Sequence, residues 1–278
     1  MYRLIIILAF ILAACTVNTQ KRPGDIVLPY AVANDSFLVH ITDLSANAKK
    51  GDTIHFVYYP DESLKSGKHM EELIEANREQ LLNKNYVFVG IAHYGSYRVK
   101  RRRDFIAPSV KTDKGYVGES PTYGQADTFF AFLKGTILPL AENKFKDHPV
   151  QRSFIGHSLG GLFATYLLIH DDTVFHNLYA LSPAIWIDDY EIMEKESTNK
   201  DRIMSYSKNI WISCGSNETF NRIRRSVATL EDSLQKRKYP GIHYSVKLYD
   251  GENHNSSVMP AMKEIFASWT NEQKKSTN

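Results

Sequence analysis

One serine stands in a setting that could make it a nucleophile. Ser158 is the centre of Gly156-His157-Ser158-Leu159-Gly160, a G-x-S-x-G pentapeptide between an apolar run and a helix-like segment. A sharp strand-to-helix turn would lift the hydroxyl above a sheet edge, and glycines without Cβ atoms would relieve the crowding there. The N–H of Leu159, at the start of the helix, could then donate to a developing oxyanion. The pattern predicts the nucleophile of an acyl-transfer enzyme; the alternative is a chance match in a glycine-bearing turn.

A serine hydroxyl needs a general base, and His254 is the candidate. Enzymes with this turn carry serine, acid and histidine in that order along the chain. The sequence has ten histidines, and only His254 follows the last predicted strand, in a loop expected over the same sheet edge as Ser158. A solvated loop histidine is the alternative. His157 adjoins the nucleophile, but we expect its side chain to point away from the site and to pack, with at most a polar contact.

The acid that orients His254 should follow the preceding strand, and Glu218 stands there. Asp232 lies in the next predicted helix and is expected to be a solvated charge. Asp250 and Glu252 are close to the histidine in sequence, but such neighbours rarely aim at each other. A Ser–His dyad without an acid remains an alternative.

A second oxyanion donor should come from the loop after the strand that ends in "FVYY". That loop reads Pro60-Asp61-Glu62-Ser63. Pro60 has no N–H to give. The backbone of Glu62 or of Ser63 is therefore the predicted donor.

The elements that must position these residues alternate between strands and helices. Apolar or alternating runs predict strands at 35–44, 52–60, 85–93, 151–158, 176–184, 209–218 and 243–251. Helical spacing predicts helices at 69–84, 125–145, 160–170, 221–238 and 257–270, with a kink expected at Pro139. The segment 94–124 reads as irregular. This alternation predicts one α/β domain with a mostly parallel sheet, helices on both faces, and a site at the carboxyl ends of the strands.

Composition limits the other classes of function. The chain has 278 residues, 43% of them hydrophobic, and a formal net charge of +3, which gives no case for a nucleic-acid partner. With only two cysteines, the sequence does not indicate a disulfide-stabilised fold. Cys214, at a strand end, is expected to be a buried structural thiol. No cluster shows metal-ligand spacing, so neither a metal nor another cofactor is implied.

The first 14 residues are expected to be a segment separate from the folded domain. Residues 1–14 combine a positive charge with a short apolar run, the pattern of an export signal that is removed. "LAAC" resembles the bacterial lipobox, which implies cleavage before Cys15 and a membrane anchor of several acyl chains on its thiol. We therefore expect a lipid-anchored protein of the bacterial cell envelope, with a weak preference for the outer membrane; ordinary secretion is the alternative. Residues 15–30 are expected to be the lipidated cysteine and its tether, 31–272 the enzyme domain and 273–278 a frayed tail.

Several motifs in order resemble one known family. They are "FVYYPDES", "VGIAHYGSYRVKRRRDFIAPS", "FFAFLKGTILPLAENKF", "FIGHSLGGLFATYLL", "LYALSPAIW" and "DGENHNSS". Together they resemble the serine esterases grouped with esterase D and the bacterial siderophore (enterobactin- and bacillibactin-type) esterases. The resemblance implies an α/β-hydrolase fold, Ser158 as nucleophile, His254 as base and Glu218 at the acid position. "YYPDE" departs from the family's usual apolar pair followed by Asp-Gly, which bears on the second oxyanion donor.

Substrate choice is less determined. The run "VKRRRD" contains Arg101, Arg102 and Arg103; it is either a solvated loop with one arginine paired to Asp104 or a basic rim for an anionic substrate such as a ferric tricatecholate. Four aromatic residues follow strands and could line the pocket or merely pack: Tyr94, Tyr97, Tyr123 and Trp186.

The function that these residues predict is a serine carboxylesterase acting on a small polar ester, with a siderophore-type ester favoured. The alternatives are a feruloyl or acetyl esterase acting on polysaccharide, an acyltransferase, and a ligand-binding lipoprotein without catalysis.

Overall fold

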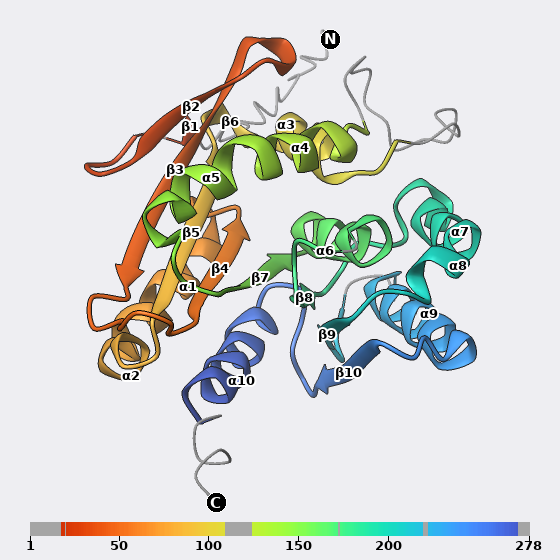
Figure 1. Cartoon of the computed structure of the whole chain (residues 1–278). Coiled ribbons are helices and arrows are strands. Elements are labelled where there is room, and N and C mark those ends of the chain that lie inside the picture. The colour runs from red at the N-terminus through yellow and green to blue at the C-terminus, as the bar shows by residue number, and fades with distance from the viewer. Residues whose placement is uncertain (1–17, 20, 109–123, 172, 219–221, 272–278) are drawn as a thin grey trace, which may run out of the picture.

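A twisted eight-stranded sheet is the centre of the computed structural model, which describes residues 18–19, 21–108, 124–171, 173–218 and 222–271 (Figure 1). The strand order is β10-β9-β8-β7-β4-β5-β3-β2. The strands are β2 (Ile26–Tyr30), β3 (Asp35–Leu44), β4 (Ile54–Pro60), β5 (Tyr86–His93), β7 (Val150–His157), β8 (Asn177–Leu181), β9 (Lys208–Gly215) and β10 (Ile242–Tyr249). From β5 to β10 the neighbours run parallel, whereas β3 and β2 are antiparallel to theirs. The carboxyl ends of the parallel strands therefore meet at one edge.

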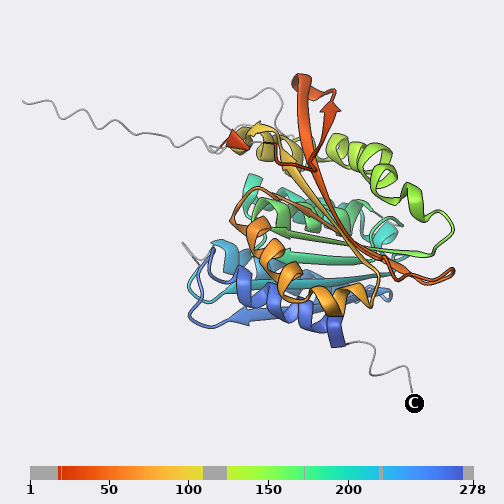
Figure 2. The same ribbon diagram turned by 90° about the vertical axis from the view of Figure 1, so that its left-hand side faces the viewer.

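Helices cover both faces of the sheet, because the parallel strands are apolar on both sides; every residue of β5 is buried. One face carries α1 (Lys65–Ala76), α2 (Arg78–Leu82) and α10 (Val258–Asn271), and Figure 2 shows α1 and α10 side by side. The other face carries α3 (Tyr97–Phe105), α4 (Ala126–Phe132), α5 (Leu138–Glu142), α6 (Leu159–His170), α7 (Glu191–Thr198), α8 (Lys200–Ile203) and α9 (Arg222–Arg237). Each face buries its own apolar cluster. The predicted α/β domain with a mostly parallel sheet is confirmed.

The described residues before 31, which are 18–19 and 21–30, contact the domain, whereas a tether was expected over 15–30. β2 is an edge strand that pairs with β3, and β1 (Asn18–Thr19) pairs with β6 (Gly95–Ser96). Arg22 forms ion pairs with Glu62 and Glu71 of the domain. The polar composition of this segment suggested a linker, but its backbone and charged groups have partners far away in sequence.

Three other predicted segments differ from the structure. The segment 94–124 contains α3, so the basic run is helical and not an irregular loop. The helix expected at 69–84 is two helices, which begin at Lys65 and divide at Asn77. In 125–145 a π-helical turn, Leu133–Ile137, precedes Pro139, and the proline occupies the first turn of α5, where its missing N–H costs little.

Neither α7 nor α8 was predicted from the sequence. Among the helices that the structure describes, none combines the length and the hydropathy needed to cross a bilayer.

Candidate active site

Ser158 sits at a strained turn between β7 and α6. Its backbone angles are φ 58° and ψ −113°, which few residues other than glycine adopt. Its N–H donates to the carbonyl of Leu181 on β8 at 2.9 Å. A Cβ added to Gly156 would lie 2.3 Å from the backbone of Gly160, so the two glycines permit a close approach that other residues would block. The predicted corner is present.

His254 and Glu218 form a hydrogen-bonded pair at the same edge. Nδ1 of His254 lies 2.9 Å from Oε2 of Glu218. The other carboxylate oxygen accepts hydrogen bonds from the Ser182 hydroxyl at 2.6 Å and from the N–H of Gly215 at 3.2 Å. Burial acts to raise the pKa of Glu218, but the hydrogen bonds from His254 and Ser182 outweigh it and lower that pKa. An ionised Glu218 places the proton of His254 on Nδ1 and leaves Nε2 as the acceptor that a general base requires.

The other carboxylates weighed as the acid lie elsewhere. Asp232 is exposed and pairs with Lys236 on its own helix. The carboxylate of Asp250 accepts from the Ser216 hydroxyl at 3.1 Å. The geometry therefore supports Glu218 for this position, and its catalytic role stays a prediction.

His157 does more than pack, and its side chain does not point away from the site. It lines the pocket next to Ser158, and its Nε2 lies 2.8 Å from the carbonyl oxygen of His254, with the two rings 4.6 Å apart. Burial and the neighbouring His254 lower the pKa of His157 to about 3, so the ring is neutral and donates from Nε2. His157 thus holds the loop of the proposed base.

These residues open on a pocket of about 530 Å³. Ser158 and His254 line it together with Ser63, Lys65, Lys68, Tyr97, Arg101 and Asn255. No hydrogen bond joins Ser158 to His254 in the part of the chain described; in ligand-free enzymes such contacts commonly tighten only when substrate binds. Within the same ranges, no group of three or more His, Cys, Asp or Glu side chains is gathered as a metal site.

The two predicted second oxyanion donors differ. The N–H of Glu62 donates to the carbonyl of Ile91 at 3.2 Å, and its carboxyl is buried against Arg22, so Glu62 is not available. Ser63 lines the pocket. The structure therefore favours Ser63, with Leu159 as the first donor at the start of α6.

Most of the residues expected at the substrate rim do not line the pocket. Arg103 is buried against Asp104 and Asp35, because α3 turns it inward. Arg102 and Tyr94 are exposed outside the lining. Trp186 is half-buried under the guanidinium of Arg222. Tyr97 and Arg101 do line the pocket, whereas Tyr123 and Cys15 fall outside the described residues.

The sequence analysis missed three charged residues that line the pocket, Asp61, Lys65 and Lys68. Lys65 and Lys68 lie on the first turn of α1, and the helix start predicted at residue 69 excluded them. Placing that start directly after the loop 60–63 would have found them. Asp61 pairs with Arg101, which is 40 positions away, and no local pattern indicates that contact.

Comparisons with known proteins identify the family of the chain. Residues 99–268 match the family described as "Putative esterase", and the chain belongs to this family. It is 28% identical over 189 residues to the ferri-bacillibactin esterase BesA of Bacillus subtilis, covering 63% of this chain and 64% of that protein. It is 26% identical over 213 residues to the siderophore triacetylfusarinine C esterase of Aspergillus fumigatus, covering 66% of this chain and 70% of that one.

The fold is also similar to that of the siderophore hydrolase EstB from Aspergillus nidulans, with a TM-score of 0.71 at 20% identity over 91% of this chain and 98% of that one. At this identity the likeness concerns the fold alone. The resemblance predicted from the motifs and the α/β-hydrolase type of fold are confirmed.

Proposed function

We propose that the protein is a serine esterase that cleaves a small anionic ester of the siderophore type. The observation that carries the proposal is that Ser158 and His254 line one pocket at the carboxyl edge of the sheet, with Glu218 hydrogen-bonded to the histidine behind it. Nε2 of His254 takes the proton of Ser158, whose oxygen attacks the ester carbonyl. The N–H groups of Leu159 and Ser63 receive the oxyanion. The alcohol leaves with a proton from His254, and water then releases the acyl group by the same steps.

The charge of the pocket supports an anionic substrate. Lys65 and Lys68 are exposed, and no ion pair joins either to a carboxylate in the part of the chain that the structure describes. Among the described lining residues only Asp61 carries a carboxylate, and Arg101 already neutralises it. A substrate with catecholate, hydroxamate or carboxylate oxygens would lie beside the two lysines. The names of the two siderophore esterases among its relatives suggest the same class.

The test is hydrolysis by the chain from residue 16 onward, beside Ser158→Ala. The substrates are p-nitrophenyl acetate and butyrate, a ferric tricatecholate lactone and methyl ferulate. The proposal expects release of acid from the lactone that disappears in the variant. Preferred cleavage of the ferulate would favour the polysaccharide esterase, and ester transfer to an added alcohol would favour the acyltransferase. Binding of the lactone without cleavage would favour the ligand-binding protein and contradict the proposal.

We also propose that lipid on Cys15 anchors this enzyme in the bacterial envelope. Asn18 pairs with Ser96, so only about 10 Å of extended chain separates Cys15 from a held residue. The domain would then sit close to the membrane surface and not on a long tether. Radiolabelled palmitate should enter the full-length chain and not Cys15→Ala; equal labelling would contradict the anchor.

A further inference from the structure

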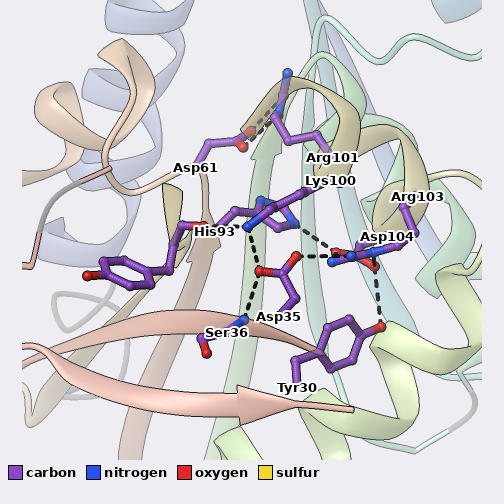
Figure 3. A network of polar contacts seen from close by, with 10 residues as sticks. Tyr30, Asp35, Ser36, Asp61, His93, Lys100, Arg101, Arg103 and Asp104 are labelled. Carbon is purple, nitrogen blue, oxygen red and sulfur yellow. Dashed lines mark hydrogen bonds and ion pairs between the residues drawn. The ribbon is translucent and has the colours of Figure 1, made fainter. Parts of the chain in front are cut away.

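Arg101 joins the two segments that flank Ser158. Its Nε lies 2.6 Å from Oδ1 of Asp61, and its Nη2 donates to Oδ2 at 2.6 Å. Nη2 also lies 3.5 Å from the carbonyl oxygen of His157, the residue before the nucleophile. Figure 3 shows the contacts between Arg101 and Asp61. One guanidinium thus contacts both the loop that carries Ser63 and the turn that carries Ser158.

Asp61 needs such a partner. Its φ is 62°, a left-handed conformation that is costly outside glycine, and its side chain is only 3% exposed. A strained residue keeps its conformation only where its surroundings hold it. Asp61 and Ser63 are two positions apart, and the carbonyl of Asp61 accepts from the N–H of Leu64 at 2.8 Å. The strained Asp61 therefore begins the turn in which Ser63 lies.

The helix that presents Arg101 is itself fixed to the sheet. On another face of α3, Lys100 and Arg103 pair with Asp35 of β3, and Arg103 also pairs with Asp104. Asp104 in turn lies 2.8 Å from Nε2 of His93 on β5 (Figure 3). Lys100 and Arg103 thus form ion pairs with the largely buried carboxylates of Asp35 and Asp104. These pairs fix the position of α3 on the sheet.

We propose that Arg101 is a positioning residue for oxyanion stabilisation: α3 holds its guanidinium so that it fixes Asp61, and thereby aims the second oxyanion donor, Ser63. This inference rests on the proposed esterase. Arg101, the arginine of the basic run that faces the pocket, would thus hold the catalytic geometry and would not bind the charge of the substrate. Its loss should therefore lower kcat and leave KM nearly unchanged, because an oxyanion exists only in the transition state.

The kinetic test uses a neutral ester, p-nitrophenyl butyrate, so that charge on the substrate plays no part. Arg101→Met and Asp61→Asn should each lower kcat roughly 10- to 100-fold, with KM within about threefold, since one lost donor costs about 10²–10³. The double variant should be no slower than the slower single one, because both remove the same contact. Arg101→Lys should recover part of the rate. Arg98→Met, an exposed site on the same helix, is the control and should match the unmodified protein.

A second readout does not depend on activity. Amide hydrogen exchange in the peptide 60–68 should quicken in Arg101→Met while the peptide 150–157, which is β7, keeps its protection. Unchanged exchange in the peptide 60–68 of Arg101→Met would overturn the positioning role, whatever the kinetics show. An unmodified protein inactive on every ester, with faster exchange in the variant, would overturn the proposed function and show only that Arg101 holds the loop 60–63. A raised KM with unchanged kcat would mean that Arg101 binds substrate instead, and would also overturn the inference.

Discussion

The two loops on either side of Ser158 are held in different ways. The loop of His254 is held through its own backbone carbonyls: the N–H of Asn217 donates to the carbonyl of Glu252 at 2.8 Å, and the ring of His157 donates to the carbonyl of His254. The loop 60–63 is held through ionisable side chains: Arg101 pairs with Asp61, and Arg22 pairs with Glu62. Both loops take part in one proposed reaction, but the contacts that hold them depend on different solution conditions.

Backbone groups do not titrate, and the lowered pKa of His157, about 3, keeps its ring neutral, whereas carboxylates do titrate. The histidine loop should therefore tolerate changes of pH and of distant residues, with Glu218 as its sensitive group. The loop 60–63 should respond to changes in the segment around Arg22 and in α3, both distant in sequence. The following experiments separate the two loops, from the largest expected effect to the smallest.

Glu218→Gln should lower kcat by roughly 10³-fold or more. The amide group of glutamine would donate to Nδ1 of His254, so the proton would move to Nε2, which could no longer act as a base. Steady-state kinetics on p-nitrophenyl butyrate would measure the loss. Asp232→Asn, an exposed carboxylate, is the control. A loss below about fivefold in Glu218→Gln would instead favour the Ser–His dyad.

Arg103→Met should lower the free energy of unfolding by about 3–5 kcal/mol, because it leaves Asp35 and Asp104 buried with fewer partners. Its bonds to Asp104 are both 2.7 Å long, and the two residues are 3% and 0% exposed. Urea unfolding measures the effect. The exposed Arg98→Met should change it by less than about 0.5 kcal/mol. Equal stability of the two variants would show that the network does not hold α3.

Glu62→Gln should flatten the dependence of stability on pH between 4.5 and about 8. Burial and the hydrogen bond with Glu71 raise the pKa of Glu62 to about 8, against the effect of Arg22. Unfolded chains ionise this group near its usual pKa of 4.5. The folded state therefore loses stability as the pH rises from there toward 8, because the unfolded state releases the proton first.

The glutamine cannot titrate, so between pH 6 and pH 9 the variant should lose about 1–2 kcal/mol less than the unmodified protein. Thermal unfolding across this range measures it. Glu75→Gln, an exposed site on α1, should follow the unmodified protein. Parallel curves for Glu62→Gln and the unmodified protein would contradict the raised pKa.

Lys65→Gln combined with Lys68→Gln should lower kcat/KM about tenfold for an anionic ester and leave a neutral ester unchanged, since exposed pairs contribute about 0.2–1 kcal/mol each. The loss should shrink at high salt. Lys49→Gln with Lys50→Gln removes two exposed lysines that lie outside the pocket lining. An equal loss in both double variants would mean that net charge acts, and not the pocket.

The histidine loop was the more predictable of the two. Ser158, Glu218 and His254 each follow a strand, and parallel strands bring their carboxyl ends together whatever their distance along the chain. Glycines at 156 and 160 indicated the turn from local crowding alone. Once the alternation of strands and helices was recognised, the order of the three residues left little choice.

The loop 60–63 was less predictable because side chains decide it. Glu62 and Ser63 were equal candidates until the bond from Glu62 to Ile91 removed one. The basic run was expected to be either a solvated loop or a basic rim for substrate, yet α3 turns Arg103 inward and Arg101 toward Asp61. The pairing of an arginine with the adjacent Asp104 could be read from the sequence, but the pairs with Asp35 and Asp61 could not, because these partners lie on other elements.

The sequence by itself determined the α/β class, the alternation of elements, the turn at Ser158 and the candidates for base and acid, because each depends on local pattern or on parallel strand order. Only the tertiary structure decided which lysine and arginine side chains face the pocket and which form the ion pairs that hold α3. It also decided that residues 22–30 belong to the domain. The physical reason is that burial and pairing of charges depend on elements far apart in the chain, and these meet only when the sheet is complete.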